Sequence, residues 1–162
     1  MTLPKLDPKR DLVLERVVDV APELVWKAWT RPEHIVKWFT PRPWETIDCR
    51  MDLRPGGEFF TMMRSPEGEE YPNSGCYLEI VEGRKLAWTE TMEPGFRPKP
   101  ATPEGLPMTA IVLIEPEGTG TKYTAIALHP DETSRMRHEE MGFHDGWGTA
   151  LDQLVAYAKT LA

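Results

Sequence analysis

The side chains that could carry chemistry in this 162-residue chain are few and scattered. There are four histidines, His34, His129, His138 and His144, but no nucleophile elbow, no zinc-protease motif and no phosphate-binding glycine loop. On a regular helix, His138 and His144 would point in different directions, whereas a metal site needs at least three converging ligands. We therefore expect no metal, no cofactor and no catalytic constellation.

Three polar residues nevertheless fall where a buried site could use them. Glu90 is in phase with Trp88 on one predicted strand, and Arg16 is in phase with Leu12 on another. If both phases are correct, two opposite charges face the interior, where they pair or anchor a polar ligand group; otherwise at least one faces solvent. His144 lies next to an expected helix break, and is either a partly exposed histidine or a polar ligand contact at a cavity mouth.

Large and adaptable apolar side chains are unusually abundant, with six Trp and eight Met. Such side chains fill cores, and they also line pockets for apolar ligands. Core packing is the simpler interpretation of each one, and a cavity lined by several is the sharper hypothesis. The set comprises Trp26, Trp29, Trp38, Phe39, Trp44, Phe60, Met62, Trp88, Tyr123 and Trp147.

Charge and composition exclude several classes of partner. The formal net charge is 19 − 26 = −7, and an acidic surface argues against nucleic acid and against anionic membranes. No apolar run approaches the roughly 20 residues of a membrane helix, and no apolar segment follows the basic N-terminal residues as in a signal peptide. Cys49 and Cys76 form no CxxC pair, which favours buried thiols in a reducing compartment. We therefore expect a cytoplasmic protein.

The elements that must position these residues are mostly strands. Residues 1–10 are charged and contain two prolines, so they predict a flexible N-terminal arm before a single domain over 11–162. A strand is followed by two short helices, then by six strands in meander order and one long helix. The strands are expected at 11–20, 45–53, 58–64, 71–82, 85–93, 108–115 and 121–128.

Local patterns add three expectations. Thr30 and Glu33 have the spacing of a capping box at the start of the second short helix. Alternation in 45–53 predicts that Ile47, Cys49, Met51 and Leu53 face inward, and that Thr46, Asp48, Arg50 and Asp52 face outward. The segment 94–107 contains five prolines in fourteen residues, which predicts a flap or a flexible insertion.

The last segment, 131–161, has the only long helical period. Phe143, Trp147 and Leu151 begin its apolar stripe, while Gly142, Gly146 and Gly148 interrupt its first turns. Each glycine costs a helix interior about 1 kcal/mol, so they indicate a break, a bulge or a close approach. A curved sheet cannot lie flat on a straight helix, and the gap between them predicts a cavity.

These elements and several motifs together resemble a known family, the bacterial proteins related to the C-terminal domain of the Hsp90 ATPase activator. This family belongs to the START-like or Bet v 1-like (SRPBCC) superfamily. The resemblance covers roughly residues 12–161, nearly the whole chain, and is carried by the ordered set rather than by one motif. The matching pieces are 16–26, 30–33 with 37–39, 52–59, Gly75 with 79–81, and Gly142 with Gly146, Trp147, Leu151 and Leu154.

The resemblance implies an α+β helix-grip fold, in which a seven-stranded antiparallel sheet curves around a long C-terminal helix and two short helices follow the first strand. It also implies a cavity between sheet and helix. The eukaryotic co-chaperone has a further N-terminal domain that helps engage Hsp90, whereas this chain has ten residues before its first strand. We therefore do not expect Hsp90 activation.

The leading hypothesis is a protein that binds a small hydrophobic or amphipathic molecule in this cavity. Two alternatives remain open: a cyclase- or aromatase-like enzyme using Glu90, His144 and Tyr123, and a chaperone-interaction module. An enzyme is the less favoured class because no catalytic constellation is visible, and a homodimer is compatible with the sequence. The expected cavity residues are Trp38, Phe39, Phe60, Met62, Trp88, Glu90, Tyr123, His144, Trp147 and Leu151.

Overall fold

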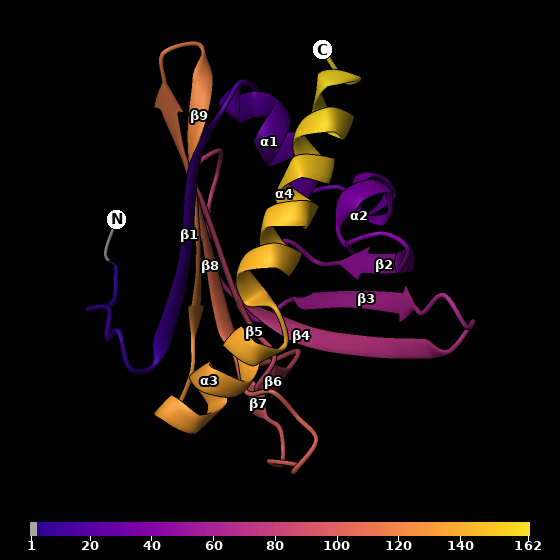
Figure 1. Ribbon diagram of the computed structural model, residues 1–162, viewed down its shortest axis with the longest axis vertical. Coiled ribbons are helices and arrows are strands. Elements are labelled where there is room, and N and C mark those ends of the chain that lie inside the picture. Colours follow the sequence, from indigo (N-terminus) through magenta and orange to yellow (C-terminus); the bar gives the residue numbers. More distant parts are fainter. Residues whose placement is uncertain (1–2) are drawn as a thin grey trace.

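A strongly curved antiparallel sheet encloses the long C-terminal helix in the computed structural model, which describes residues 3–162 (Figure 1). The strands are β1 (Asp11–Val18), β2 (Glu45–Met51), β3 (Glu58–Arg64), β4 (Glu70–Val81), β5 (Lys85–Thr89), β6 (Met92–Glu93), β7 (Arg97–Pro98), β8 (Thr109–Glu117) and β9 (Gly120–Leu128). The helices are α1 (Pro22–Trp29), α2 (Pro32–Trp38), α3 (Glu132–Glu140) and α4 (Phe143–Lys159).

The main sheet has seven strands in the order β1-β9-β8-β5-β4-β3-β2, all paired antiparallel. Strands β6 and β7 form a separate two-stranded hairpin at the start of the proline-rich segment. Figure 1 shows α4 lying across the concave side of the sheet, with α1 and α2 beside it and α3 at its N-terminal end. The predicted helix-grip fold is therefore confirmed. Within residues 3–162, no helix is long and apolar enough to cross a bilayer.

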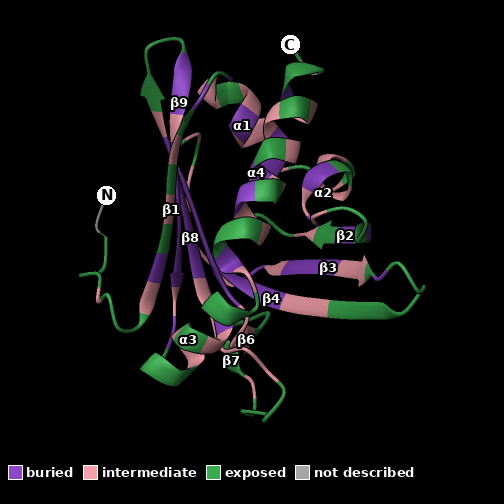
Figure 2. Ribbon diagram, viewed as in Figure 1, coloured by how far each residue is buried: buried purple, intermediate pink, exposed green. Residues whose placement is uncertain are grey.

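The core lies between the sheet and α4. The central strands contribute side chains with no exposed surface, such as Leu86, Val112 and Ala125, and α4 contributes Leu154 and Ala158 from its apolar stripe. Figure 2 shows this as buried segments on β8, β9 and the sheet-facing side of α4, with exposed residues on the opposite side of the helix. The helix is held mainly by this one-sided burial, because propensity alone rarely stabilises a helix of this length.

The expected capping box of α2 is wrong. The N-cap of α2 is Arg31, without a side-chain hydrogen bond, and Pro32 occupies the first turn. The Thr30 hydroxyl instead donates to the carbonyl of Trp26 at 2.7 Å. Thr30 is the C-cap of α1, so its side chain is used by the helix that ends there.

A β-bulge changes the expected faces of β2. The pairing with β3 shifts between Thr46 and Asp48, and the extra residue reverses the alternation there. Thr46 is consequently buried while Ile47 is 37% exposed, the opposite of the prediction for both. Beyond the bulge the predicted phase holds within β2, with Cys49 buried and Arg50 exposed, but Leu53, predicted to face inward, follows the end of the strand and is exposed.

The long C-terminal helical region is broken at Gly142. This residue has φ of 95°, the left-handed conformation that glycine adopts most readily, and it separates α3 from α4. The side chain of Asp131 caps α3 by accepting from the Ser134 N–H at 2.8 Å. Gly148 lies further along α4, where an added Cβ would come within 2.6 Å of Arg16 Nη2. Gly148 thus permits a close approach between α4 and β1.

Candidate ligand-binding cavity

A cavity of about 750 Å³ lies between the concave face of the sheet and the N-terminal half of α4. Its floor comes from strands through Phe59, Thr61 and Met63 of β3, Trp88 of β5 and Tyr123 of β9. Its helical wall comes from Trp38, His138, Gly146, Trp147 and Leu151, and residues 99–102 and 105–108 line it from the proline-rich segment. The volume falls within the range usual for small-molecule sites, about 300–1,000 Å³.

Aromatic rings form a large part of the apolar wall. Trp29 packs against Trp38 with 4.9 Å between ring centroids and against Trp88 with 5.3 Å. Phe59 meets Trp88 edge to face at 5.2 Å. These rings hold one another in edge-to-face or tilted arrangements, which favours a wall that keeps its shape without a ligand.

One part of the wall is polar. Burial raises the pKa of the Glu90 carboxyl, while the Lys99 ammonium and the Trp88 indole N–H oppose that rise. The buried indole N–H lies near the Glu90 carboxyl and favours its ionised form, but among residues 3–162 Trp88 Nε1 makes no hydrogen bond of good geometry. Trp88 is 2% exposed, and leaving such a donor unpaired costs about 1–3 kcal/mol. The cavity wall therefore carries a carboxyl and an ammonium group, while the indole N–H of Trp88 is sealed from solvent beside Glu90.

Tyr123 supplies a second polar group but a partnered one. Its hydroxyl accepts a hydrogen bond from Trp29 Nε1 at 3.2 Å. Burial raises the pKa of the Tyr123 phenol, so the group is neutral at physiological pH. Its hydroxyl can still donate to a ligand.

The proline-rich segment closes one side of the cavity. Lys99 Nζ donates to the Ser74 carbonyl, and its backbone N–H donates to the Thr91 carbonyl at 2.9 Å. At the other end of the segment, Arg137 of α3 donates to the carbonyls of Pro103 and Gly105. Of the two predicted alternatives, these contacts favour a flap attached to both the sheet and α3.

The structure brings together seven of the ten expected cavity residues, and it places Phe60 and Met62 elsewhere. Strand neighbours point to opposite faces, so Phe59, Thr61 and Met63 line the cavity while Phe60 and Met62 lie on the far face. There the Arg50 guanidinium covers the Phe60 ring at 3.9 Å from its centroid. The seven that line the cavity are Trp38, Phe39, Trp88, Glu90, Tyr123, Trp147 and Leu151.

His144 also lies outside the cavity. Its side chain is 54% exposed, and its Nε2 is 3.4 Å from a carboxylate oxygen of Glu139. Arg16 does not meet Glu90, because its guanidinium donates to Asp152 of α4 at 2.7 Å. Arg16 thus faces the helix, as its phase suggested, but its partner comes from α4.

Several cavity residues were not predicted from the sequence, among them the inner face of β3, Lys99 and His138. The face of β3 could have been found, because pairing β2 with β3 around the turn at Pro55 places Phe60 opposite the outward-facing Arg50. Lys99 and His138 had no such signal, since their positions depend on the path of the proline-rich segment and on the break at Gly142. Within the described residues, no group of three or more His, Cys, Asp or Glu side chains is placed to hold a metal ion.

Comparisons with known proteins agree with this architecture. The family model described as Activator of Hsp90 ATPase homolog 1-like protein matches residues 19–159. A Nitrosomonas europaea protein of known crystal structure is 48% identical, with TM-score 0.90 over 96% of this chain and 97% of that chain. An AHSA1-like protein from Aeromonas hydrophila, 21% identical over 93% of both chains with TM-score 0.71, shares the fold. No curated protein matches significantly.

Proposed function

We propose that this chain, which belongs to the Activator of Hsp90 ATPase homolog 1-like family, binds a small hydrophobic or amphipathic molecule between its sheet and α4. The observation that carries the proposal is the cavity of about 750 Å³ with aromatic walls. Cavities of this size and lining bind ligands by removing apolar surface from water, at about 25 cal/mol per Å². A closed, fully packed interior would have favoured an interaction module instead.

The polar groups support an amphipathic ligand rather than a pure hydrocarbon. Glu90, Lys99 and Tyr123 all line the cavity and can meet the polar part of a ligand. A few placed polar groups in an apolar pocket orient a ligand and give it specificity.

A cyclase-like reaction is a second candidate. Glu90 and Tyr123 line the same cavity and are both kept from ionising freely by burial, which raises the pKa of each. A raised pKa keeps the proton on such a group to higher pH, and in its protonated form the group can act as a general acid on a ligand held in a folded pose. His144, the third expected group, is outside the cavity and has no part in this candidate.

The binding proposal is tested by native mass spectrometry of freshly purified protein and by titration with an apolar fluorescent dye. Gly146 lines the cavity, whereas Thr149 is exposed on α4. Gly146→Leu should fill part of the cavity and reduce dye uptake, and Thr149→Leu should leave uptake unchanged. Equal uptake by wild type and both variants would place the dye outside the cavity and refute the proposed site.

A further inference from the structure

Two buried histidines lie in contact at the α3 end of the cavity. His129, just after β9, is 6% exposed and His138 of α3 is 7% exposed. His129 Nε2 and His138 Nδ1 are 2.9 Å apart, a hydrogen-bond distance. One of these two nitrogens must therefore carry a proton and the other must accept it.

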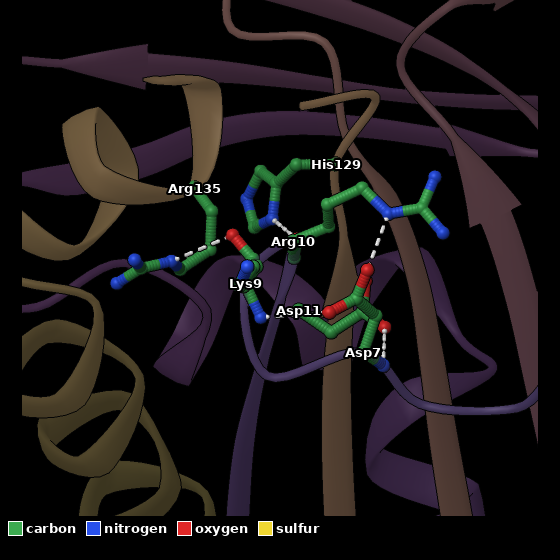
Figure 3. A network of polar contacts seen from close by, with 6 residues as sticks. All are labelled: Asp7, Lys9, Arg10, Asp11, His129 and Arg135. Carbon is green, nitrogen blue, oxygen red and sulfur yellow. Dashed lines mark hydrogen bonds and ion pairs between the residues drawn. The ribbon is translucent and has the colours of Figure 1, made fainter. Parts of the chain in front are cut away.

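A main-chain carbonyl decides which nitrogen donates. His129 Nδ1 lies 2.7 Å from the carbonyl oxygen of Arg10, as shown in Figure 3. A carbonyl oxygen can only accept, so His129 Nδ1 carries a proton. Arg135 Nε donates to the Lys9 carbonyl at 3.1 Å, and Arg10 Nε pairs with Asp7 at 2.8 Å. The acceptor thus lies in a turn that is bound to α3 and closed by an ion pair of its own.

Proton counting then determines the state of His138. A neutral imidazole carries one proton, so neutral His129 has an unprotonated Nε2, and His138 Nδ1 must donate to it. His138 Nε2 is then left with a lone pair. Burial, with a smaller contribution from the neighbouring His129, lowers the pKa of His138 to about 4, which keeps this ring neutral near pH 7.

The remaining nitrogen of His138 is available to a ligand. His138 lines the cavity, and among residues 3–162 nothing hydrogen-bonds to its Nε2, which is not sealed from solvent as Trp88 Nε1 is. Phe143 and Trp147 pack edge to face on the imidazole, with centroids 5.2 and 6.0 Å away. An acceptor is therefore held rigidly among aromatic rings at the cavity wall.

We propose that His138 Nε2 is a built-in hydrogen-bond acceptor that selects ring-containing ligands bearing a hydroxyl group, such as phenols or ring alcohols. The relay of two hydrogen bonds, from His138 to His129 and from His129 to the Arg10 carbonyl, fixes the tautomer of His138. The rings of Phe143 and Trp147 receive the apolar part of the ligand. This inference rests on the proposed binding function and adds the class of ligand. An ether in place of the hydroxyl presents only an acceptor, and His138 Nε2 offers it no proton.

The tautomer can be measured without any ligand. Long-range ¹H–¹⁵N correlation spectra distinguish protonated from unprotonated imidazole nitrogens. At about pH 8, well above the ordinary histidine pKa of about 6.5, both histidines should carry their proton on Nδ1. A protonated Nε2 on His138 would overturn the proposal, whatever the protein binds.

The ligand preference is tested with 2-naphthol and 2-methoxynaphthalene, followed by quenching of tryptophan fluorescence. Wild type should bind the naphthol about tenfold more tightly, the effect expected of one hydrogen bond. His138→Phe, which keeps an aromatic ring of similar shape, should abolish the difference in affinity. His129→Phe should reduce it, because the tautomer of His138 is then no longer fixed by a hydrogen bond to His129.

The outcomes separate the two proposals. Equal affinity of wild type for both probes refutes the acceptor role of His138 and leaves cavity binding intact. A preference for the naphthol that survives in His138→Phe also refutes that role. Failure of both probes to bind counts against the proposed binding function itself, while the tautomer measurement continues to test the relay.

Discussion

Replacing Gly146 by alanine should stabilise the protein, although Gly146 lines the cavity. A Cβ built at this position meets no atom within 4 Å, and the backbone there does not have the positive φ that would strain alanine. Alanine is favoured over glycine in a helix interior by about 1 kcal/mol, chiefly because the unfolded chain loses freedom. For a chain of this size, that gain raises the melting temperature by about 2–4 °C.

Gly148→Ala is the matched control on the same helix. Here the added Cβ would lie 2.6 Å from Arg16 Nη2, so the guanidinium that donates to Asp152 must move. The Arg16 and Asp152 side chains are 39% and 71% exposed, and an exposed pair of this kind contributes at most about 1 kcal/mol. The gain in helix propensity and the loss of the ion pair should nearly cancel.

Urea unfolding followed by circular dichroism measures both effects. Gly146→Ala should move the midpoint upward without changing the slope, and Gly148→Ala should leave it near the wild-type value. A Gly146→Ala protein no more stable than wild type would refute the open space beside Gly146. An equal rise in both variants would refute the contact between Gly148 and Arg16.

Three further outcomes are expected. The pKa of His138 is about 4 in the fold and about 6.5 unfolded, so the unfolded state binds more protons between these pH values. The free energy of unfolding therefore falls as pH falls through this range, by up to roughly 3 kcal/mol. Urea unfolding at several pH values should show a smaller loss of stability in His138→Phe, and an unchanged loss would contradict this assignment. Arg137→Ala should speed amide hydrogen exchange in residues 99–107 while the β8 and β9 amides exchange as in wild type, and unaltered exchange in 99–107 would mean that Arg137 does not hold the flap. Both cysteines, Cys49 and Cys76, are buried, and burial raises the pKa of the Cys49 thiol to about 12. They should therefore react with a disulfide reagent only when the protein unfolds in urea, and rapid labelling of the native protein would contradict their burial.

The sequence predicted the architecture well because the sheet and α4 depend on patterns that repeat along the chain. The apolar stripe through Leu151 and Leu154 indicated the side of α4 that faces the core, and both residues are buried. Alternation in β2 failed only at its bulge, where one extra residue put Thr46 inside and Ile47 outside. A bulge leaves no compositional signal, so alternation alone could not locate it.

The cavity residues were predicted less completely for a different reason. Phe59 and Phe60 are adjacent and chemically identical, so composition could not choose the face of β3, although pairing with Arg50 could. His138 faces the cavity only because Gly142 turns the chain between α3 and α4. Tertiary neighbours, and not local pattern, decide such positions.

The hydrogen bond from His129 to the Arg10 carbonyl has a consequence for mutational tolerance. The acceptor is a main-chain atom, so any residue at position 10 that keeps the turn supplies the same oxygen. Side-chain substitutions there can alter surface charge without reversing the polarity of the histidine pair. Among natural variants, position 10 should therefore drift freely, whereas changes at His129 and His138 should occur together.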